Sequence, residues 1–275
     1  IFYSLRMNKI LLIGCGHMGL ALLTAWSSKT NNRFSVVDPI QYKKINQRFN
    51  KRIQAFKTLN QVRDFLLFDV IIFAVKPQIA RSVLENFKSR QFKKSAIFIS
   101  IIAGKKINFF NQFLPLRNQF IRVMPNMPAI IDQGMSCMVS NRYVSRTNKN
   151  KIELLFSKVG LTLWLKKEIE INKVTAISGS GPGYVFLFID AFEKAALQLG
   201  LGKKSTKKLI HQTVSGSINL LLQEKKSAEE LANNIAIKGG TTEAALNKLK
   251  KNNDFHNKLK KAVKAAFLRA NALGK

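Results

Sequence analysis

Short apolar runs alternate with polar, helix-like stretches along the first half of this chain of 275 residues. Two of the helix-like stretches are Leu20–Ser28 and Ile79–Phe87. The apolar runs each have the length of a buried strand, and they are Lys9–Ile13, Phe34–Val37, Val70–Val75, Ala96–Ile101 and Phe120–Met124. Because strands that alternate with helices pair side by side in one direction, the pattern predicts a parallel sheet with helices on both faces.

Two further apolar runs, Met135–Val139 and Leu161–Leu165, are expected to extend this sheet, with a helix near Lys149–Val159 between them. The pattern changes near Glu168, and from Gly183 onward it is helical only. The predicted helices are Tyr184–Leu199, Ser205–Gln223, Thr241–Lys251 and Phe255–Ala272. The first of them is apolar on every face at its start, so we expect a partner subunit to cover it.

The chain is strongly basic, with 46 Lys and Arg against 15 Asp and Glu and a formal net charge of +31. Such a charge attracts anions, including nucleic acids. The basic residues are spread along the whole sequence, however, without a finger spacing of Cys and His, a basic tail or a basic motif interleaved with aromatic residues. We therefore expect a solvated basic surface and no specific nucleic-acid site, with weak polyanion binding as the alternative.

The sequence contains no apolar run of the roughly 20 residues that span a bilayer, and no signal-peptide layout. Its only cysteines are Cys15 and Cys137, so a disulfide framework is not needed and a reducing cytoplasm is the expected location. The sequence begins at Ile1, and we expect Met7 to be the natural start.

A G-x-G-x-x-G motif follows the first apolar run directly and opens a helix-like stretch. In this setting Gly14 permits a tight turn, Gly16 lets the backbone approach a pyrophosphate, and Gly19 lets strand and helix pack closely. The N-terminus of the helix adds free N–H groups and a partial positive charge. The motif predicts a dinucleotide site made by Gly14, Cys15, Gly16, His17, Met18 and Gly19. A plain strand–turn–helix is the alternative.

Asp38, which closes the second apolar run about 20 residues after the motif, bears on the choice of cofactor. A carboxylate at this place accepts hydrogen bonds from both hydroxyls of the adenosine ribose and repels a 2′-phosphate, which favours NADH. Alternatively, Asp38 caps a turn with Pro39 while Lys43 and Lys44 hold the phosphate of NADPH. Both cofactors stay open, with NADH favoured.

Several segments beyond the motif resemble the pyrroline-5-carboxylate reductase family, over nearly the whole chain. Residues 74–78 read AVKPQ as in the family, residues 100–104 read SIIAG against SxAAG, and residues 122–129 read RVMPNMPA against RVMPNTPA. Met127 in place of Thr is a modest departure. The resemblance implies that the nicotinamide side of the cofactor is contacted by Ala74, Val75, Lys76, Pro77, Ile102, Ala103 and Gly104.

The most specific segment, residues 174–184, reads VTAISGSGPGY and is similar to the family's TALSGSGPAY. Its Ser and Gly residues leave room for close backbone approach, and Pro182 suits the first turn of a helix. A structural role in helix entry and helix–helix contact is as consistent with this segment as direct chemistry. Glu168 matches a family glutamate near the substrate, and an ordinary surface carboxylate is the alternative reading.

Residues 234–242 read NIAIKGGTT, which resembles the family's NVTSPGGTT. The resemblance implies that Asn234 contacts the cofactor, that N–H groups of Gly239 and Gly240 bind the substrate carboxylate, and that Thr241 and Thr242 are catalytic. Ordinary capping by the threonines is the alternative, but it does not account for the glycine pair. The chain departs from the family at Ala236-Ile237-Lys238, where Lys238 either pairs with the carboxylate or points into solvent.

The resemblance implies reduction of 1-pyrroline-5-carboxylate to L-proline by hydride transfer from NADH or NADPH to the ring imine carbon. A protonated imine is already a strong electrophile, so the protein mainly aligns the reactants. This fits a chain with three scattered histidines and no metal motif. We expect an α/β protein with a Rossmann-type doubly wound sheet domain over residues 1–167 and an all-α dimerisation and substrate domain over residues 168–275. A homodimer is expected, and a larger ring of dimers is left open.

Two rival functions stay open at this point. One is a related imine or β-hydroxyacid oxidoreductase of the same plan, for which Lys173 and Lys194 are candidate catalytic lysines, although neither lies in a matching motif. The other is an inactive relative that binds polyanions through its basic surface.

Overall fold

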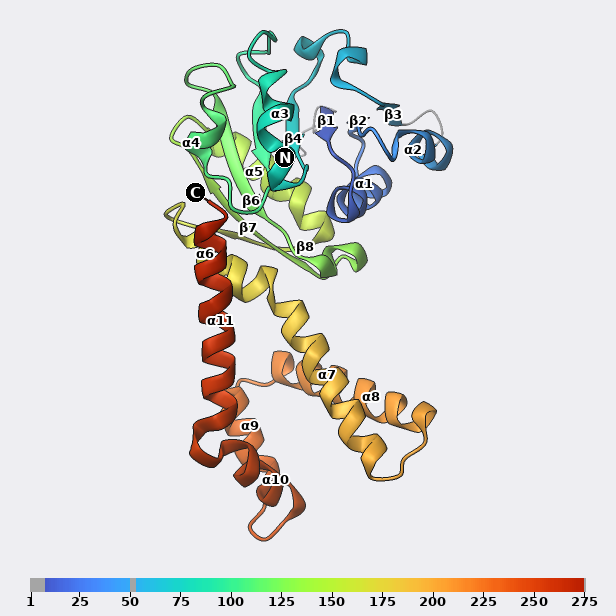
Figure 1. The fold of residues 1–275 in the computed structure, drawn as a ribbon, viewed down its shortest axis with the longest axis vertical. Helices are drawn as coiled ribbons and strands as arrows, with labels where there is room; N and C mark the ends of the chain where they lie inside the picture. Colours follow the sequence, from blue (N-terminus) through green and yellow to red (C-terminus); the bar gives the residue numbers. More distant parts are fainter. Residues whose placement is uncertain (1–7, 50–52, 275) are drawn as a thin grey trace, which may run out of the picture. The chain divides into compact units, whose positions relative to one another are not determined.

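The computed structural model describes residues 8–49 and 53–274, which divide into two compact units (Figure 1). The first unit runs to residue 180 and also includes residues 266–274, and the second unit is residues 181–265. This division differs from the predicted boundary after residue 167, because the segment that follows Glu168 and the end of the last helix pack with the sheet. The domain assignment itself stays a prediction. Met7, the expected start, lies outside the described residues.

Within the described residues, eight strands form one sheet in the order β3-β2-β1-β4-β5-β6-β7-β8. The strands are β1 (Lys9–Ile13), β2 (Arg33–Val37), β3 (Ile53–Phe56), β4 (Val70–Phe73), β5 (Ile97–Ser100), β6 (Gln119–Met124), β7 (Gly134–Ser140) and β8 (Gly160–Trp164). Among these strands, β7 pairs antiparallel with β6, and the other neighbours pair parallel. The five strands predicted to be parallel are parallel, and β7, for which the sequence pattern indicated no direction, is the antiparallel one among the described strands. The link from Met124 to Gly134 holds a short 3-10 turn and is too short for a crossover helix.

Strand β3 and helix α2 (Tyr42–Phe49) were not predicted. Strand β3 has four residues, lies at the edge of the sheet, and alternates buried with more exposed side chains, so it lacks a continuous apolar run. Helix α2 buries Ile45 alone among its described residues. Asn46 on this helix ties the two elements together, because its side chain bonds both the N–H and the carbonyl of Ala55 at 3.0 Å.

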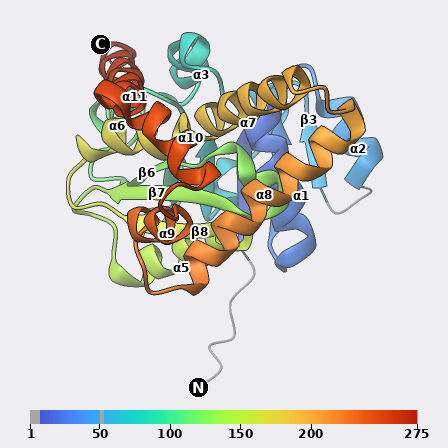
Figure 2. The ribbon, with the colours of Figure 1, turned by 90° about the horizontal axis from the view of Figure 1, so that it is seen from below.

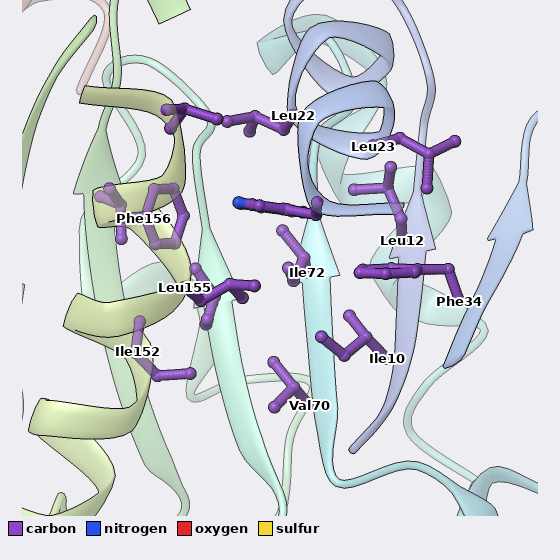
Figure 3. Close-up of a cluster of buried hydrophobic side chains, with 14 of the residues drawn as sticks. Ile10, Leu12, Leu22, Leu23, Phe34, Val70, Ile72, Ile152, Leu155 and Phe156 are labelled. Carbon is purple, nitrogen blue, oxygen red and sulfur yellow. The ribbon is translucent and has the colours of Figure 1, made fainter. Parts of the chain in front are cut away.

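Helices cover both faces of the sheet, and the alternation of side chains along each strand serves both layers. Helices α1 (His17–Lys29) and α5 (Arg146–Phe156) lie over one face, where Leu22 and Phe156 pack toward Leu12 and Ile72 of the central strands (Figure 3). Helices α3 (Ala80–Glu85) and α4 (Ile107–Phe110) cover the other face, where the buried side chains include Phe73, Phe98 and Phe110. The first unit therefore has a large core of its own.

The segment after β8 is helical from Glu170, and Pro182 does not interrupt the helix that contains it. Helix α6 (Glu170–Val174) leads into a π-helical turn at Thr175–Gly179 and then into α7 (Gly181–Gln198). Pro182 lies in the first turn of α7, as predicted. The last helix, α11 (Asp254–Ala272), begins in the second unit and ends in the first.

The second unit is helical and contains α7, α8 (Lys203–Gln223), α9 (Ala228–Ile235) and α10 (Thr241–Lys250). Helices α7 and α8 lie side by side (Figure 2). Helix α9 was not predicted, although its capping box of Ser227 and Glu230 was a signal for it. Within residues 181–265, all of which the structure describes, the buried side chains are Ala196, Thr206 and Ile210 alone.

Large apolar side chains on this unit are exposed in the single chain, with Phe186 at 65% and Leu187 at 69%. A soluble monomer rarely exposes an apolar surface of this extent, so the expectation that α7 needs a covering partner agrees with its exposure here. None of the helices in the described ranges combines the length and apolar character needed to cross a bilayer.

We expect Phe156→Ala to lower the free energy of unfolding of the first unit by about 3–5 kcal/mol, because the side chain is fully buried against the sheet and leaves a cavity. Urea unfolding followed by fluorescence measures the change. Leu161→Ala is the matched control, since Leu161 is 76% exposed and its loss should cost far less. Equal losses for the two variants would contradict the packing described here.

Candidate active site

The G-x-G-x-x-G turn lies where the order of strands reverses, between β1 and β4. Gly14 has φ +90°, and a Cβ atom there would lie 2.7 Å from the carbonyl oxygen of Ala74. The N–H of Gly14 donates to Val37 O at 2.8 Å, and the N–H of Ala74 donates to Ile13 O at 2.7 Å. The predicted phosphate turn and the predicted AVKPQ turn therefore touch each other at the carboxyl edge of the sheet.

Gly16 and Gly19 have the surroundings that their predicted roles require. A Cβ atom on Gly19 would lie 2.8 Å from Gly14 O, so this glycine allows α1 to pack on the turn. Around Gly16 the protein leaves a Cβ position open, with nothing described within 4 Å. Gly16 is the N-cap of α1 and offers no side chain to the first N–H groups, and His17 beside it is exposed. The residues thus fit a bound pyrophosphate at the start of the helix.

Asp38 holds the phosphate turn to the turn that follows β2. One carboxylate oxygen accepts the N–H of Cys15 at 2.7 Å, and the other accepts the N–H groups of Ile40 at 2.9 Å and Gln41 at 2.7 Å. The side chain is 8% exposed. This is the turn-capping arrangement, the second of the two alternatives for Asp38, and it commits most of the carboxylate to backbone groups.

Both cysteines are buried in the first unit. Burial, with the nearby carboxylate of Asp38 as a second cause, raises the pKa of the Cys15 thiol to about 12. Burial also raises the pKa of Cys137. Neither thiol is prepared to act as a nucleophile, and the described residues contain no group of three His, Cys, Asp or Glu side chains that could hold a metal ion.

The turn after β5 offers mainly backbone atoms, and few side-chain atoms, to the candidate site. Ile102 is buried in the apolar layer under α3 and α4, and its N–H donates to Ser100 Oγ at 3.1 Å. Gly104 is buried with φ +79°. The predicted contact of Ile102 with the cofactor is therefore limited to main-chain atoms, since its side chain faces the core. Lys76 is exposed at the start of the AVKPQ turn, where it precedes Pro77.

Glu168 has a partner that neither of its two predicted readings included. Its Oε1 atom lies 3.2 Å from Arg122 Nη1, and Arg122 is 2% exposed. The same oxygen accepts the N–H of Ile107 at 2.8 Å. Burial lowers the pKa of Arg122, and the charge of Glu168 opposes that shift. Glu168 is thus an anchoring carboxylate for a buried arginine rather than an ordinary surface group, and its role toward substrate stays a prediction.

Asn126 was not among the predicted site residues, although it lies in the RVMPN segment. Its side chain donates to Ser178 O at 3.0 Å and accepts the N–H of Met135 at 2.8 Å. It therefore ties the end of β6 to the π-helical turn of the SGSGP segment. Single π-helical turns inside α-helices are frequent at functional sites, because they shift the side chains on one face of the helix.

In the second unit, the backbone N–H groups of the turn before α10 are bonded to acceptors in the turn and in α10 itself. The N–H of Gly239 donates to Glu243 Oε2 at 2.7 Å, and the N–H of Gly240 donates to Ile237 O at 2.9 Å. These bonds contradict the expectation that the two glycine N–H groups are free for a carboxylate. The N-cap of α10 is Gly240, so capping by a threonine hydroxyl, the alternative role, is also absent at this described turn.

The other predicted residues of this unit are on its surface. Lys238 and Asn234 are exposed, and Thr242 is half-buried next to the exposed Thr241. Of the two rival lysines, Lys194 pairs with Asp190 at 2.6 Å and Lys173 is exposed on α6. No single unit gathers all the predicted site residues, because the dinucleotide residues lie in the first and the GGTT turn lies in the second.

The buried thiols allow a test of the phosphate turn. With a pKa of about 12, about one Cys15 thiol in ten thousand is ionised at pH 8 and about one in a thousand at pH 9, so the thiol stays almost fully protonated over this range. We expect iodoacetamide to label neither cysteine of the folded protein within minutes, and both after unfolding in urea. Rapid labelling of Cys15 at pH 8 would show that the turn is open or differently charged.

Two family models match the chain. Residues 168–273 match the model described as pyrroline-5-carboxylate reductase dimerisation, and residues 9–104 match NADP oxidoreductase coenzyme F420-dependent. The pyrroline-5-carboxylate reductase of Pasteurella multocida is 30% identical over 88% of this chain and 89% of that protein. Pyrroline-5-carboxylate reductase 2 of Bacillus subtilis is 32% identical over 88% of this chain and 87% of that protein.

Solved structures agree with these relatives. Pyrroline carboxylate reductase of Plasmodium falciparum with NADP bound has a TM-score of 0.86 and 30% identity, and the match covers 98% of each chain. A pyrroline-5-carboxylate reductase of Coxiella burnetii also has a TM-score of 0.86 and 30% identity, covering 98% of this chain and all of the other. With these identities over most of its length, the chain belongs to the pyrroline-5-carboxylate reductase family.

Proposed function

We propose that this protein reduces 1-pyrroline-5-carboxylate to L-proline with NADPH or NADH. The observation that carries the proposal is the contact of Gly14 with Ala74 at the strand reversal, beside the open N-terminus of α1. Such a crevice is where open α/β sheets bind dinucleotides. The family relationship supplies the substrate, which the geometry of the described residues alone does not select.

The dinucleotide, when bound, supplies a hydride to the imine carbon. The residues of this chain bind the dinucleotide and the imine and orient them toward each other. Backbone N–H groups from Gly16 to Met18 hold the pyrophosphate at the start of α1. The turns at Ala74–Pro77 and Ile102–Gly104 support the nicotinamide half, and Asn234 adds a contact. Since a protonated imine accepts a hydride readily, alignment of the two reactants is the main contribution of the protein.

Thr241 and Thr242 are the proposed catalytic residues, and Thr242 bonds the ring nitrogen and holds the proton there. Because both glycine N–H groups of the turn are already bonded, the substrate carboxylate binds the first N–H groups of α10. Lys238 adds a positive charge in place of the family's Thr-Ser-Pro. The carboxylate of Glu243 at the same helix start opposes an anion, which makes the charge of Lys238 more important.

The functional species is a homodimer, as the match to the dimerisation model supports. The exposed apolar side chains of α7 and α8 are the surface that a second copy covers. The proposal extends to a ring of such dimers, which mass measurement in solution distinguishes from a single dimer.

Replacing Thr242 with Ala tests the catalytic assignment. We expect kcat/KM for 1-pyrroline-5-carboxylate to fall on the order of a hundredfold, because a hydrogen bond to the reacting nitrogen is lost, while the Kd of NADPH stays unchanged. NADPH oxidation followed by absorbance measures the rate. Thr213→Ala is the matched control, since its hydroxyl bonds the backbone of its own helix. Wild-type turnover of the imine by Thr242→Ala would move the site elsewhere.

Asp38→Asn tests the cofactor assignment. The amide would place a donor against the N–H of Cys15, so we expect binding of NADH and NADPH to weaken by similar factors, about tenfold. Fluorescence titration with each cofactor measures both. Asp64→Asn is the control, because that carboxylate also accepts a backbone N–H but lies outside the loop. A change that favours NADPH alone would show that Asp38 faces the adenosine ribose instead.

A further inference from the structure

The end of helix α11 lies directly on the turn that follows β5. A Cβ atom on Gly104 would lie 2.7 Å from both the Cβ atom and the carbonyl oxygen of Leu273. A Cβ atom on Gly274 would likewise lie 2.8 Å from Gly104 O. The two segments therefore meet backbone to backbone, and no side chain fits between them.

The other side of the same turn is held by an ion pair. Ile107, the first residue of α4, donates its N–H to Glu168 Oε1 at 2.8 Å. That oxygen also lies 3.2 Å from the guanidinium of Arg122, which is buried under it. Because a buried guanidinium is costly to leave unpaired, Glu168 is kept in place, and with it the entry into α4.

Two asparagines connect the end of α11 to this ion pair. Asn172 donates from Nδ2 to Asn271 Oδ1 at 2.8 Å. The Oδ1 atom of Asn172 accepts from Arg122 Nη2 at 3.5 Å, and the side chain of Asn172 is buried. Residues 101–106 are thus fastened on one side by Glu168 and on the other by α11, and both supports are linked through Arg122.

We propose that Asn271 and Leu273 are positioning residues for the cofactor. They would act through the turn at Ile102–Gly104, which supports the nicotinamide half, and this inference rests on the proposed function. The turn offers main-chain atoms there, since Ile102 is buried in the core and Gly104 has no side chain. A displaced backbone cannot be corrected by a change of rotamer, so the support from α11 sets the affinity for the cofactor.

Asn271→Leu removes the acceptor for Asn172 at similar volume. We expect the Kd of NADPH, measured by fluorescence titration without imine, to rise about fivefold, the effect of one net hydrogen bond. The KM for NADPH should rise with it while the KM for the imine stays unchanged, a split that general loss of stability would not produce. Asn271→Asp keeps the acceptor and should restore binding. Asn257→Leu, on the exposed part of the same helix, should bind as the wild type does.

A folded Asn271→Leu variant with the wild-type Kd would overturn the inference. If that variant does not fold, Asn271→Ala, which removes the same acceptor for Asn172 with a smaller side chain, decides in the same way. A wild-type protein that binds NADPH but does not reduce the imine would overturn the proposed function and leave the positioning role testable by Kd. A wild-type protein that binds neither cofactor would overturn both.

Discussion

The close contact between the backbones at Gly14 and Ala74 is the constraint on which the site depends. This contact holds the ends of β1 and β4 together. After β1 the chain continues to α1 on one face of the sheet, and after β4 it continues to α3 on the other face. A side chain at Gly14 would separate the two turns, and the crevice for the dinucleotide would lose one wall. Asp38, directly after β2, closes the arrangement by accepting the N–H of Cys15. The sheet thus supplies its binding edge through main-chain atoms.

Most of the sheet was predictable from the sequence, because β1, β4, β5 and β6 are buried on both faces over most of their length and consist mainly of apolar residues. The motif of three glycines was equally informative, since Gly14 and Gly19 each have a steric reason in the structure and Gly16 leaves open space at the start of α1. Strand β3 escaped prediction because it lies at the edge and needs apolar residues on one side only. The direction of β7 depends on the length of its connection rather than on its own residues.

Pairing between distant residues was the part of the site that the sequence did not disclose. The resemblance drew attention to Glu168 without its partner, because Arg122 lies 46 positions earlier and nothing in the sequence joins the two. Asp38 was expected at a ribose, yet the geometry gives its oxygens to Ile40, Gln41 and Cys15. In the GGTT turn, Glu243 takes an N–H group that the motif alone leaves free. Each case concerns which donor meets which acceptor, and this is decided by tertiary structure.

The scarcity of buried side chains in residues 181–265 has a thermodynamic consequence. Helices that enclose almost no core of their own cannot offset the entropy of ordering their chain. Folding of this unit and its association with a second copy then form one equilibrium. The second copy stabilises the folded unit as a bound ligand would, and the stabilisation increases with protein concentration. Dilution would lower the midpoint of thermal unfolding of the helical unit. The midpoint of the sheet unit, which has two apolar layers of its own, would not change.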